Sequence, residues 1–341
     1  MKILFLIKGN YAYGGGGAKS GLLDSAKLTA MQLIKHFGID AKVEICIDGN
    51  DIDREVFIFK PDICVIEAIW VTPAKVEEIT KLHPKTKFYI RVHSEIPFLA
   101  TEGIAMKWLK EYPLIKNVIV CFNSSVTTND FNKTLNHVIY LPNLYSYLST
   151  SSNEFVTEDV KLLPHKKKHI DIASFGALRP MKNQLLQAFA AIEYGNIFNK
   201  IIHFNINAGR TEQGGDQVLK NIRYLFEGTK HTLVEHAWLS RGDFLELVSF
   251  MDIGLQISFS ESFNIVTADF VRSGIPIIVS HAVRWMPDKC KVGFDVSEIS
   301  DKINHVLSFS DHYIHTAKRA LNRYNDDALE VWEHFLNVEE K

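Results

Sequence analysis

The stretch "SFSESFNIVTADFVRSGIPIIVS", from Ser258 to Ser280, contains a polar loop, a short apolar helix and an apolar strand. The helix is predicted from about Ile265 to Ser273, because Gly274 ends it and Pro276 prevents its continuation. A strand-like run, "DIGLQIS", comes before the loop, and "IPIIVS" reads as the next strand. The stretch is therefore one strand–helix–strand unit, as expected in an α/β protein.

The same alternation extends in both directions along the chain. Strand-like runs such as "KILFLI", "DICVIEAI" and "KFYIRVH" alternate with helical segments, and a second series starts at "IDIASFG". Strands that are apolar throughout are typical of parallel sheets covered on both faces. Between residues 142 and 168 the composition turns polar and the periodicity fades, which predicts a link between two domains. Two such domains imply a cleft, and ligands bind at the carboxyl ends of their strands.

The composition is that of an ordinary globular protein. Among 341 residues, 46% are hydrophobic and 23% are charged, and the net charge of −2 favours neither nucleic acid nor membrane as a partner. No apolar run reaches the roughly 18 residues that span a bilayer, and the start reads as a first strand, not a signal peptide. The four cysteines fit neither a metal site nor a disulfide framework, so we expect buried free thiols in a cytoplasmic protein.

A glycine-rich loop, "GGGGAKSG" from Gly14 to Gly21, follows the first predicted strand and opens a helix. It does not match a phosphate loop, because Tyr13 and Ala18 stand where that loop requires glycine. It does not match the dinucleotide pattern either, because Lys19 or Ser20 stands at the position of the third glycine. A structural turn needs one or two glycines instead of four. The loop is therefore predicted to contact a ligand through its backbone at Gly15, Gly16 and Gly17.

Two further groups of polar residues lie at predicted strand ends. Arg179 and Lys182, in "SFGALRPMKNQLL", follow the first strand of the second domain, where two cations suit a diphosphate. His93 follows the strand of "YIRVHSEIPF" at its carboxyl end. The alternatives are a solvated loop for the two cations and a structural role for the histidine.

The first-quoted stretch contains two carboxylates, Glu261 in the loop and Asp269 in the second turn of the helix. Carboxylates recognise sugar diols well, because they accept two hydrogen bonds. The backbone amides at the helix N-terminus can bind phosphate, and they belong to Asn264, Ile265, Val266 and Thr267. The alternative is a capping glutamate and a solvated aspartate.

Taken in order, these features resemble glycosyltransferases of the GT-B fold, and most closely the retaining, family 4-like group. The family pattern "S-x-x-E-G-F-G-x-x-x-x-E-A-x-x-x-G-x-P-V-I" has its counterpart in Ser258–Ser280, with serine and asparagine at the glycine positions and Asp269 for the second glutamate. Pro142 and Asn143 correspond to the "PN" pair at the passage between domains, and "GALRPMKN" corresponds to the diphosphate-binding segment. Ala177 stands at the family arginine position, with Arg179 two residues later.

The resemblance implies a fold and a set of site residues. The fold is two Rossmann-like domains facing each other across a cleft, residues 1–145 with a returning helix at about 323–341, and residues 146–322. It implies that Lys182 binds the diphosphate, that Glu261 contacts the donor sugar and that Asp269 contacts the ribose. His93 resembles the N-domain histidine that touches the transferred sugar. The segments resembling those that frame the base contain Asn207, Gly209 and Trp238.

The predicted function is transfer of a hexose or pentose from a nucleotide-diphosphate sugar to an acceptor hydroxyl, with retention of configuration. We favour a UDP-sugar over a GDP- or ADP-sugar as donor, and we expect no other cofactor. No D-x-D pair follows a strand in the expected position, so no metal is predicted.

Three alternatives remain open. One is a nucleotide-sugar epimerase of the same fold, and another is a nucleotide-sugar-binding module without turnover. The third is a transferase that acts on DNA, for which "HKKKH" with Lys166 to Lys168 is the basic cluster, although charge runs are usually solvated. The acceptor is thus a glycan, a small molecule or DNA.

Overall fold

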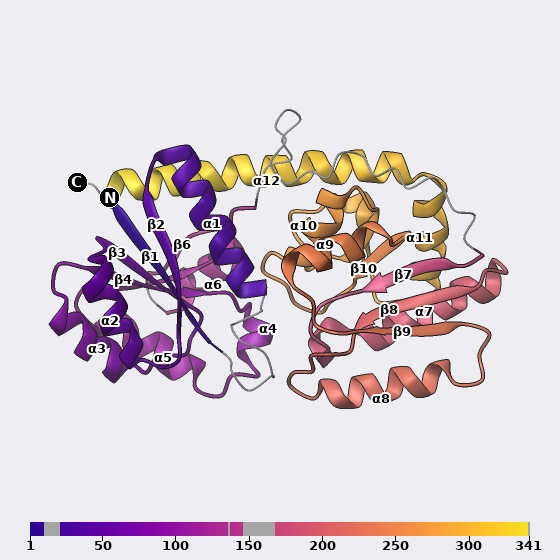
Figure 1. Cartoon of the computed structure of the whole chain (residues 1–341), viewed down its shortest axis with the longest axis horizontal. Coiled ribbons are helices and arrows are strands. Elements are labelled where there is room, and N and C mark those ends of the chain that lie inside the picture. Colours follow the sequence, from indigo (N-terminus) through magenta and orange to yellow (C-terminus); the bar gives the residue numbers. More distant parts are fainter. Residues whose placement is uncertain (10–20, 136, 146–167, 340–341) are drawn as a thin grey trace. The chain divides into compact units, whose positions relative to one another are not determined.

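In the computed structural model of the chain, residues 1–9, 21–135, 137–145 and 168–339 are described. The chain divides into two compact units: unit 1 comprises Met1–Ser146 with Tyr324–Lys341, and unit 2 comprises Tyr147–Arg323 (Figure 1). Each unit contains one six-stranded sheet. The strand pairs are parallel in both sheets, as the continuous apolar strands predict.

The sheet of unit 1 has the strand order β2-β1-β3-β4-β5-β6. Its strands are β1 (Lys2–Lys8), β2 (Asp40–Cys46), β3 (Ile63–Glu67), β4 (Lys87–Val92), β5 (Val118–Phe122) and β6 (Ile139–Tyr140). The helices of the unit are α1 (Gly21–Phe37), α2 (Asn50–Phe59), α3 (Pro73–Leu82), α4 (Ile96–Leu99), α5 (Ala105–Glu111), the 3₁₀ turn η2 (Tyr112–Leu114) and α6 (Ser125–Thr134).

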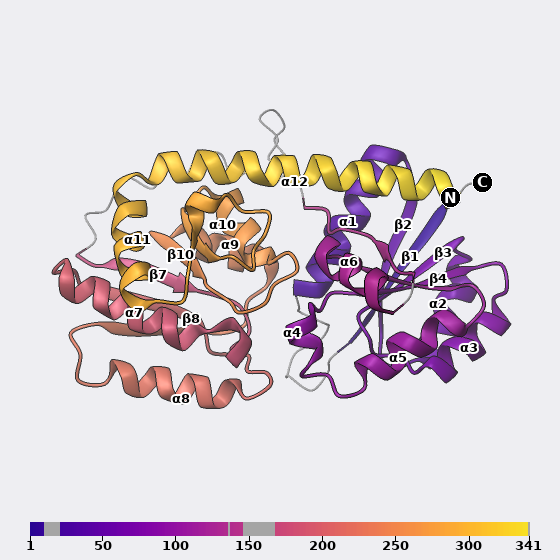
Figure 2. The ribbon, with the colours of Figure 1, turned by 180° about the vertical axis from the view of Figure 1, so that it is seen from behind.

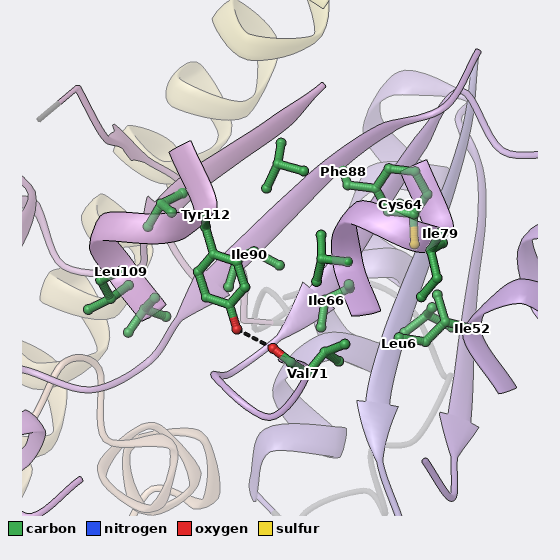
Figure 3. Close-up of a cluster of buried hydrophobic side chains, with 14 of the residues drawn as sticks. Leu6, Ile52, Cys64, Ile66, Val71, Ile79, Phe88, Ile90, Leu109 and Tyr112 are labelled. Atoms are coloured by element: carbon green, nitrogen blue, oxygen red, sulfur yellow. Dashed lines mark hydrogen bonds between the residues drawn. The ribbon is translucent and has the colours of Figure 1, made fainter. Parts of the chain in front are cut away.

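Successive side chains of a strand point to opposite sides of the sheet, and in unit 1 both sides are covered by helices and buried. Leu4 and Leu6 of β1 join a cluster with residues of α2, α3, α5 and α6. Figure 3 shows part of this cluster, in which the Tyr112 hydroxyl donates to the Val71 carbonyl. Phe5 faces the other way, in a cluster with residues of α1 and of the C-terminal helix.

Unit 2 has the strand order β12-β11-β10-β7-β8-β9. Its strands are β7 (Ile170–Ser174), β8 (Ile202–Asn207), β9 (Thr232–His236), β10 (Ile253–Gln256), β11 (Ile277–Ser280) and β12 (Lys291–Val292). Its helices are η3 (Pro180–Lys182), α7 (Gln184–Ile197), α8 (Gly215–Phe226), α9 (Arg241–Ser249), α10 (Ile265–Ser273), η4 (Asp288–Cys290), α11 (Val296–Ser308) and the first part of α12 (Ser310–Glu339).

The last part of α12 belongs to unit 1 (Figure 2). Trp332 is fully buried there, and its indole N–H donates to the Pro142 carbonyl at 2.9 Å. Its ring lies edge-on to that of Phe5, with centroids 6.4 Å apart. The predicted return of the C-terminal helix to the N-terminal domain is therefore confirmed.

Two simpler predictions also have an outcome. The four cysteines are free and buried, as predicted. Among the described helices, none combines the length and the apolar character needed to cross a membrane.

Candidate functional site

The strand order of unit 2 reverses between β7 and β10. The chain runs outward from β7 to β8 and β9, and then returns to place β10 on the other side of β7. In open α/β sheets the crevice at the carboxyl ends of such strands is the usual place for a ligand. Lys182 follows β7 and Glu261 follows β10, so the topology brings two predicted site residues to this point.

Lys182 and Glu261 form an ion pair in which the ammonium group donates to Oε1 of the carboxylate. Their side chains are only 11% and 8% exposed. Burial lowers the pKa of Lys182 below its ordinary value, Glu261 opposes this effect, and the nearby charge of Arg179 reinforces it. The pair is thus two nearly buried charged groups next to the ends of β7 and β10.

The loops around this pair are joined by hydrogen bonds. The Phe259 amide donates to the Met181 carbonyl at 3.0 Å, and the Asn183 side chain donates to the Ile257 carbonyl at 3.2 Å. The loops after β7 and β10 are therefore held together. Leu178 in turn receives a hydrogen bond from the Glu212 amide at 2.9 Å, which attaches the loop after β8.

Arg179 begins a series of contacts between charged and aromatic side chains. Arg179 contacts the Glu212 carboxylate at 3.3 Å, and Arg210 contacts the same carboxylate at 2.5 Å. The Arg210 guanidinium lies over the Trp238 ring, 4.8 Å from its centroid. Arg179 and Trp238 were both predicted for the site, whereas Glu212 and Arg210, which connect them, were not.

Asn207 and Gly209, the other two residues predicted near the base, have clear local roles. Asn207 is buried at the end of β8, and its side-chain oxygen accepts a hydrogen bond from the Gly176 amide at 2.9 Å. A Cβ atom on Gly209 would lie 2.7 Å from the backbone nitrogen of Trp238, which is too close. Glycine therefore lets the loops after β8 and β9 approach each other closely.

Helix α10 begins and ends at the predicted residues. Asn264 caps its start with a left-handed backbone, and its side-chain oxygen accepts a hydrogen bond from the Thr267 amide at 2.9 Å. The Thr267 amide is thus already occupied. Ile265 and Val266 supply the other two amides of the first turn, and such amides have no partner inside a helix.

Asp269 is fully buried and binds a residue that sequence reasoning missed. Arg241, the first residue of α9, donates one N–H to Asp269 Oδ2 at 2.7 Å and another to Oδ1. This two-pronged contact fixes the guanidinium plane. The Arg241 side chain stays 25% exposed at the carboxyl edge of the sheet. The signal for it was its position in the first turn of a helix that follows a strand.

In unit 1, a buried polar network lies at the carboxyl ends of β3, β4 and β5. Glu67 and Arg91 are opposite each other in adjacent strands, and their side chains contact at 2.9 Å with no exposure. Arg91 also donates to the carbonyls of Leu141 and Pro142 and to the side chain of Asn143. The "PN" pair is therefore held by a buried arginine.

His93 belongs to the same network. One ring nitrogen, Nε2, contacts Glu67, and the other, Nδ1, accepts from the Asn123 side chain at 3.0 Å. Burial lowers the pKa of His93, although Glu67 opposes this effect. For Glu67, burial would raise the pKa, but the charges of Arg91 and His93 outweigh it and hold it below its usual range. The network thus joins the buried Glu67–Arg91 pair to the imidazole of His93.

Gly15, Gly16 and Gly17 of the predicted ligand loop lie outside the described residues. Their predicted contact with a ligand stays a prediction, as do the individual roles of the other site residues.

Comparison with known proteins gives the fold of the whole chain. No family model matches the sequence, and no curated protein does either. Among solved structures, the apo form of OtsA is similar over 100% of this chain and 99% of its own, with 10% identity and a TM-score of 0.69.

Two other structures are similar over equally long stretches. For α,α-trehalose 6-phosphate synthase from Burkholderia multivorans, the shares covered are 100% and 96%, with 12% identity and a TM-score of 0.66. For HepE from Anabaena, solved with UDP and glucose, both shares are 100%, with 14% identity and a TM-score of 0.65. This chain therefore has the fold predicted from its sequence, the two-domain α/β GT-B architecture that these proteins share.

Proposed function

We propose that the chain is a retaining glycosyltransferase that moves a hexosyl or pentosyl group from a nucleotide-diphosphate sugar to an acceptor hydroxyl. The observation that carries the proposal is the Lys182–Glu261 pair at the strand-order reversal of unit 2. The cation suits the diphosphate, and the carboxylate suits the hydroxyls of the attached sugar. A UDP-sugar is the favoured donor, since HepE was solved with UDP and glucose.

The reaction requires stabilisation of the leaving group. As the bond between the sugar and the diphosphate breaks, negative charge grows on the diphosphate, and Lys182, with Arg179, is the proposed source of the positive charge that offsets it. The amides of Ile265 and Val266 are the better candidates for a phosphate contact, because the Thr267 amide already donates to Asn264.

The remaining assignments follow from the contacts of each residue. Trp238, under the Arg210 guanidinium, offers a ring face for the base. Asp269 acts on the ribose through Arg241, because both of its oxygens bind that residue. His93 stays the predicted contact of the transferred sugar in unit 1.

Retention is proposed to proceed by attack on the face that the diphosphate leaves. The acceptor oxygen forms the new bond to the sugar carbon, and the leaving phosphate takes the acceptor proton. No metal ion is assigned a part in this step, because Lys182, Arg179 and the helix amides supply the positive charge.

The test compares variants of the donor site. Thermal unfolding is measured with UDP-, GDP- and ADP-sugars, because a ligand that binds the folded state raises the melting temperature. We expect a shift with one of them, greatest for a UDP-sugar, and its loss in Lys182→Ala. The control is Lys200→Ala, which removes an exposed lysine just before β8. It should keep the full shift.

Activity is then followed with the donor that binds. Lys182→Ala should lower the rate of donor cleavage by roughly 10²–10³-fold, as expected for the loss of one charge-stabilising donor. Anomeric configuration of the product, read by nuclear magnetic resonance, tests retention. If the donor sugar is epimerised when no acceptor is present, the protein is an epimerase. If the donor binds but is not turned over, the protein is a binding module. If no nucleotide sugar shifts the melting temperature, the proposal is wrong.

A further inference from the structure

Three potential metal ligands meet at the amino ends of β7 and β8, at the other end of these strands from the proposed donor site. His169 directly precedes β7, Asp171 is the second residue of β7, and His203 is the second residue of β8. Their ligand atoms all lie within 4.8 Å of one another. Lys182 and Glu261, by contrast, follow the carboxyl ends of β7 and β10. The cluster is therefore separate from the proposed donor site.

The backbone explains why these three side chains converge. Asp171 and His203 are direct partners in the register of β7 and β8, so their side chains point to the same face of the sheet. His169 stands two residues before Asp171, just outside the strand, and its Nε2 lies 3.3 Å from Asp171 Oδ2, so it reaches the same face. Sequence reasoning had recorded His169 only as a flank of the basic cluster "HKKKH".

The distances suit a small divalent transition metal. His169 Nε2 lies 3.3 Å from Asp171 Oδ2, and His203 Nδ1 lies 3.8 Å from Asp171 Oδ1. Ligands about 2.0–2.2 Å from a tetrahedral zinc ion are separated by roughly 3.3 Å, a spacing that the His169–Asp171 pair already has. Two imidazoles and one carboxylate form a donor set that zinc commonly takes, with water in the fourth position.

The two imidazole rings are stacked, with centroids 3.6 Å apart and an angle of 11° between their planes, so one ring must turn about its side-chain torsions for both nitrogens to face one ion. The carboxylate between them is held by its surroundings. The Asn205 side chain donates to Asp171 Oδ1 at 3.3 Å, and its own oxygen contacts His236 at 2.8 Å. Such outer contacts orient metal ligands in known sites. The His169 and His203 side chains are 30% and 29% exposed, which leaves access from solvent.

We propose that His169, Asp171 and His203 form a zinc-binding site that fastens the start of β7 to β8. The proposed site lies at the start of β7, the first described strand of unit 2. Its role is structural and does not involve the transferred sugar.

The test uses the untagged full-length chain, stripped of metal with a chelator and titrated calorimetrically with zinc chloride. We expect one zinc ion per chain and a higher melting temperature. Asp171→Asn and His203→Gln should each weaken binding by at least about 10-fold, since loss of even an outer contact of a metal site costs 10–100-fold. His315→Ala, which removes an exposed histidine of α12, is the matched control and should bind as the parent chain does.

Circular dichroism of each metal-free variant first checks that it is folded, and His169→Gln replaces any variant that is not. The proposal is overturned if the parent chain binds no zinc, or if the folded variants bind it as tightly as the parent. Donor-induced thermal shifts of the metal-free chain should equal those of the zinc-loaded chain. A donor shift that requires zinc would contradict the separation of the two sites.

Discussion

At the scale of single residues, Asp269 shows how a carboxylate can lie inside an apolar helix. Its side chain is fully buried, and the cost of burying a charge is offset by two N–H donors of Arg241. The Asp–Arg pair also joins α10 to α9, the helix that precedes it in the chain. The carboxylate is therefore a structural anchor as well as a candidate for ligand recognition.

Asp269→Asn should destabilise unit 2 by roughly 2–3 kcal/mol. Removal of one partner from a fully buried pair typically costs about 3–5 kcal/mol, and the partial exposure of Arg241 reduces that figure. Urea unfolding measures the change. Glu246→Gln, at an exposed position of α9, should change stability by less than about 0.5 kcal/mol. Equal stabilities of the two variants would show that the buried pair contributes nothing.

We expect His93 to make the stability of unit 1 depend on pH. Its pKa is lowered in the folded chain, mainly by burial. As the pH falls, the histidine of the unfolded chain therefore gains a proton before that of the folded chain does. Stability is therefore kept above pH of about 6.5 and falls as the pH drops below that value. The slope contributed by one such group is at most about 1.4 kcal/mol per pH unit.

His93→Gln should flatten this acid-side loss of stability. The glutamine amide can still donate to Glu67, so the comparison rests on the slope between pH 7.5 and 5.5 and not on absolute stability. Hydrogen exchange of β3 and β4 reports unit 1 directly. His137→Gln, which makes the same replacement at an exposed position, is the matched control. An unchanged slope in His93→Gln would mean that another group is responsible.

At the scale of elements, the two ends of α10 are set by two residues with left-handed backbones. Asn264 caps the start, with φ of 61°, and Gly274 caps the end, with φ of 71°. Asparagine and glycine are the residues that most readily adopt this conformation. Local chemistry of this kind is readable from sequence, which is why the bounds of the helix were predicted correctly.

Gly274→Ala should destabilise the chain by about 1–2 kcal/mol, the cost of a left-handed conformation for a residue with a Cβ atom. Space is not the reason, because the nearest atom to that Cβ would lie at an ordinary 3.6 Å. Gly242→Ala provides the opposite case. Gly242 lies in α9 with nothing within 4 Å of its Cβ position, so alanine should stabilise by about 0.5–1 kcal/mol. Thermal unfolding of both variants tests the difference in sign.

Contacts between elements were harder to predict than the elements. Glu67 and Arg91 each stand in an apolar strand, and nothing local shows that they pair. Their contact depends on β3 and β4 being neighbours in a register that places them side by side. Likewise, Arg241 meets Asp269 only because α9 packs against α10. By contrast, Lys182 and Glu261 were grouped in advance by the resemblance to a family pattern, and the structure shows that they follow the two strands that flank the reversal of strand order.

At the scale of the whole molecule, α12 contributes to both units, and its Trp332 is part of the core of unit 1. Trp332→Ala should destabilise unit 1 by about 3–5 kcal/mol, through the lost burial and the cavity that remains. Hydrogen exchange should increase in β1 and β3 and stay unchanged in β7 and β8. Phe309→Ala, at an exposed aromatic of unit 2, should leave β1 and β3 unaffected. Equal loss of protection in both sheets would contradict an effect confined to unit 1.

The contact between Lys182 and Glu261 also has an entropic consequence. A lysine side chain that becomes fixed loses roughly 1.5–2 kcal/mol of rotamer freedom. Here Glu261 holds the ammonium group before any ligand arrives, so that loss is incurred when the chain folds. A ligand that bound the lysine in this orientation would not incur that entropic loss a second time.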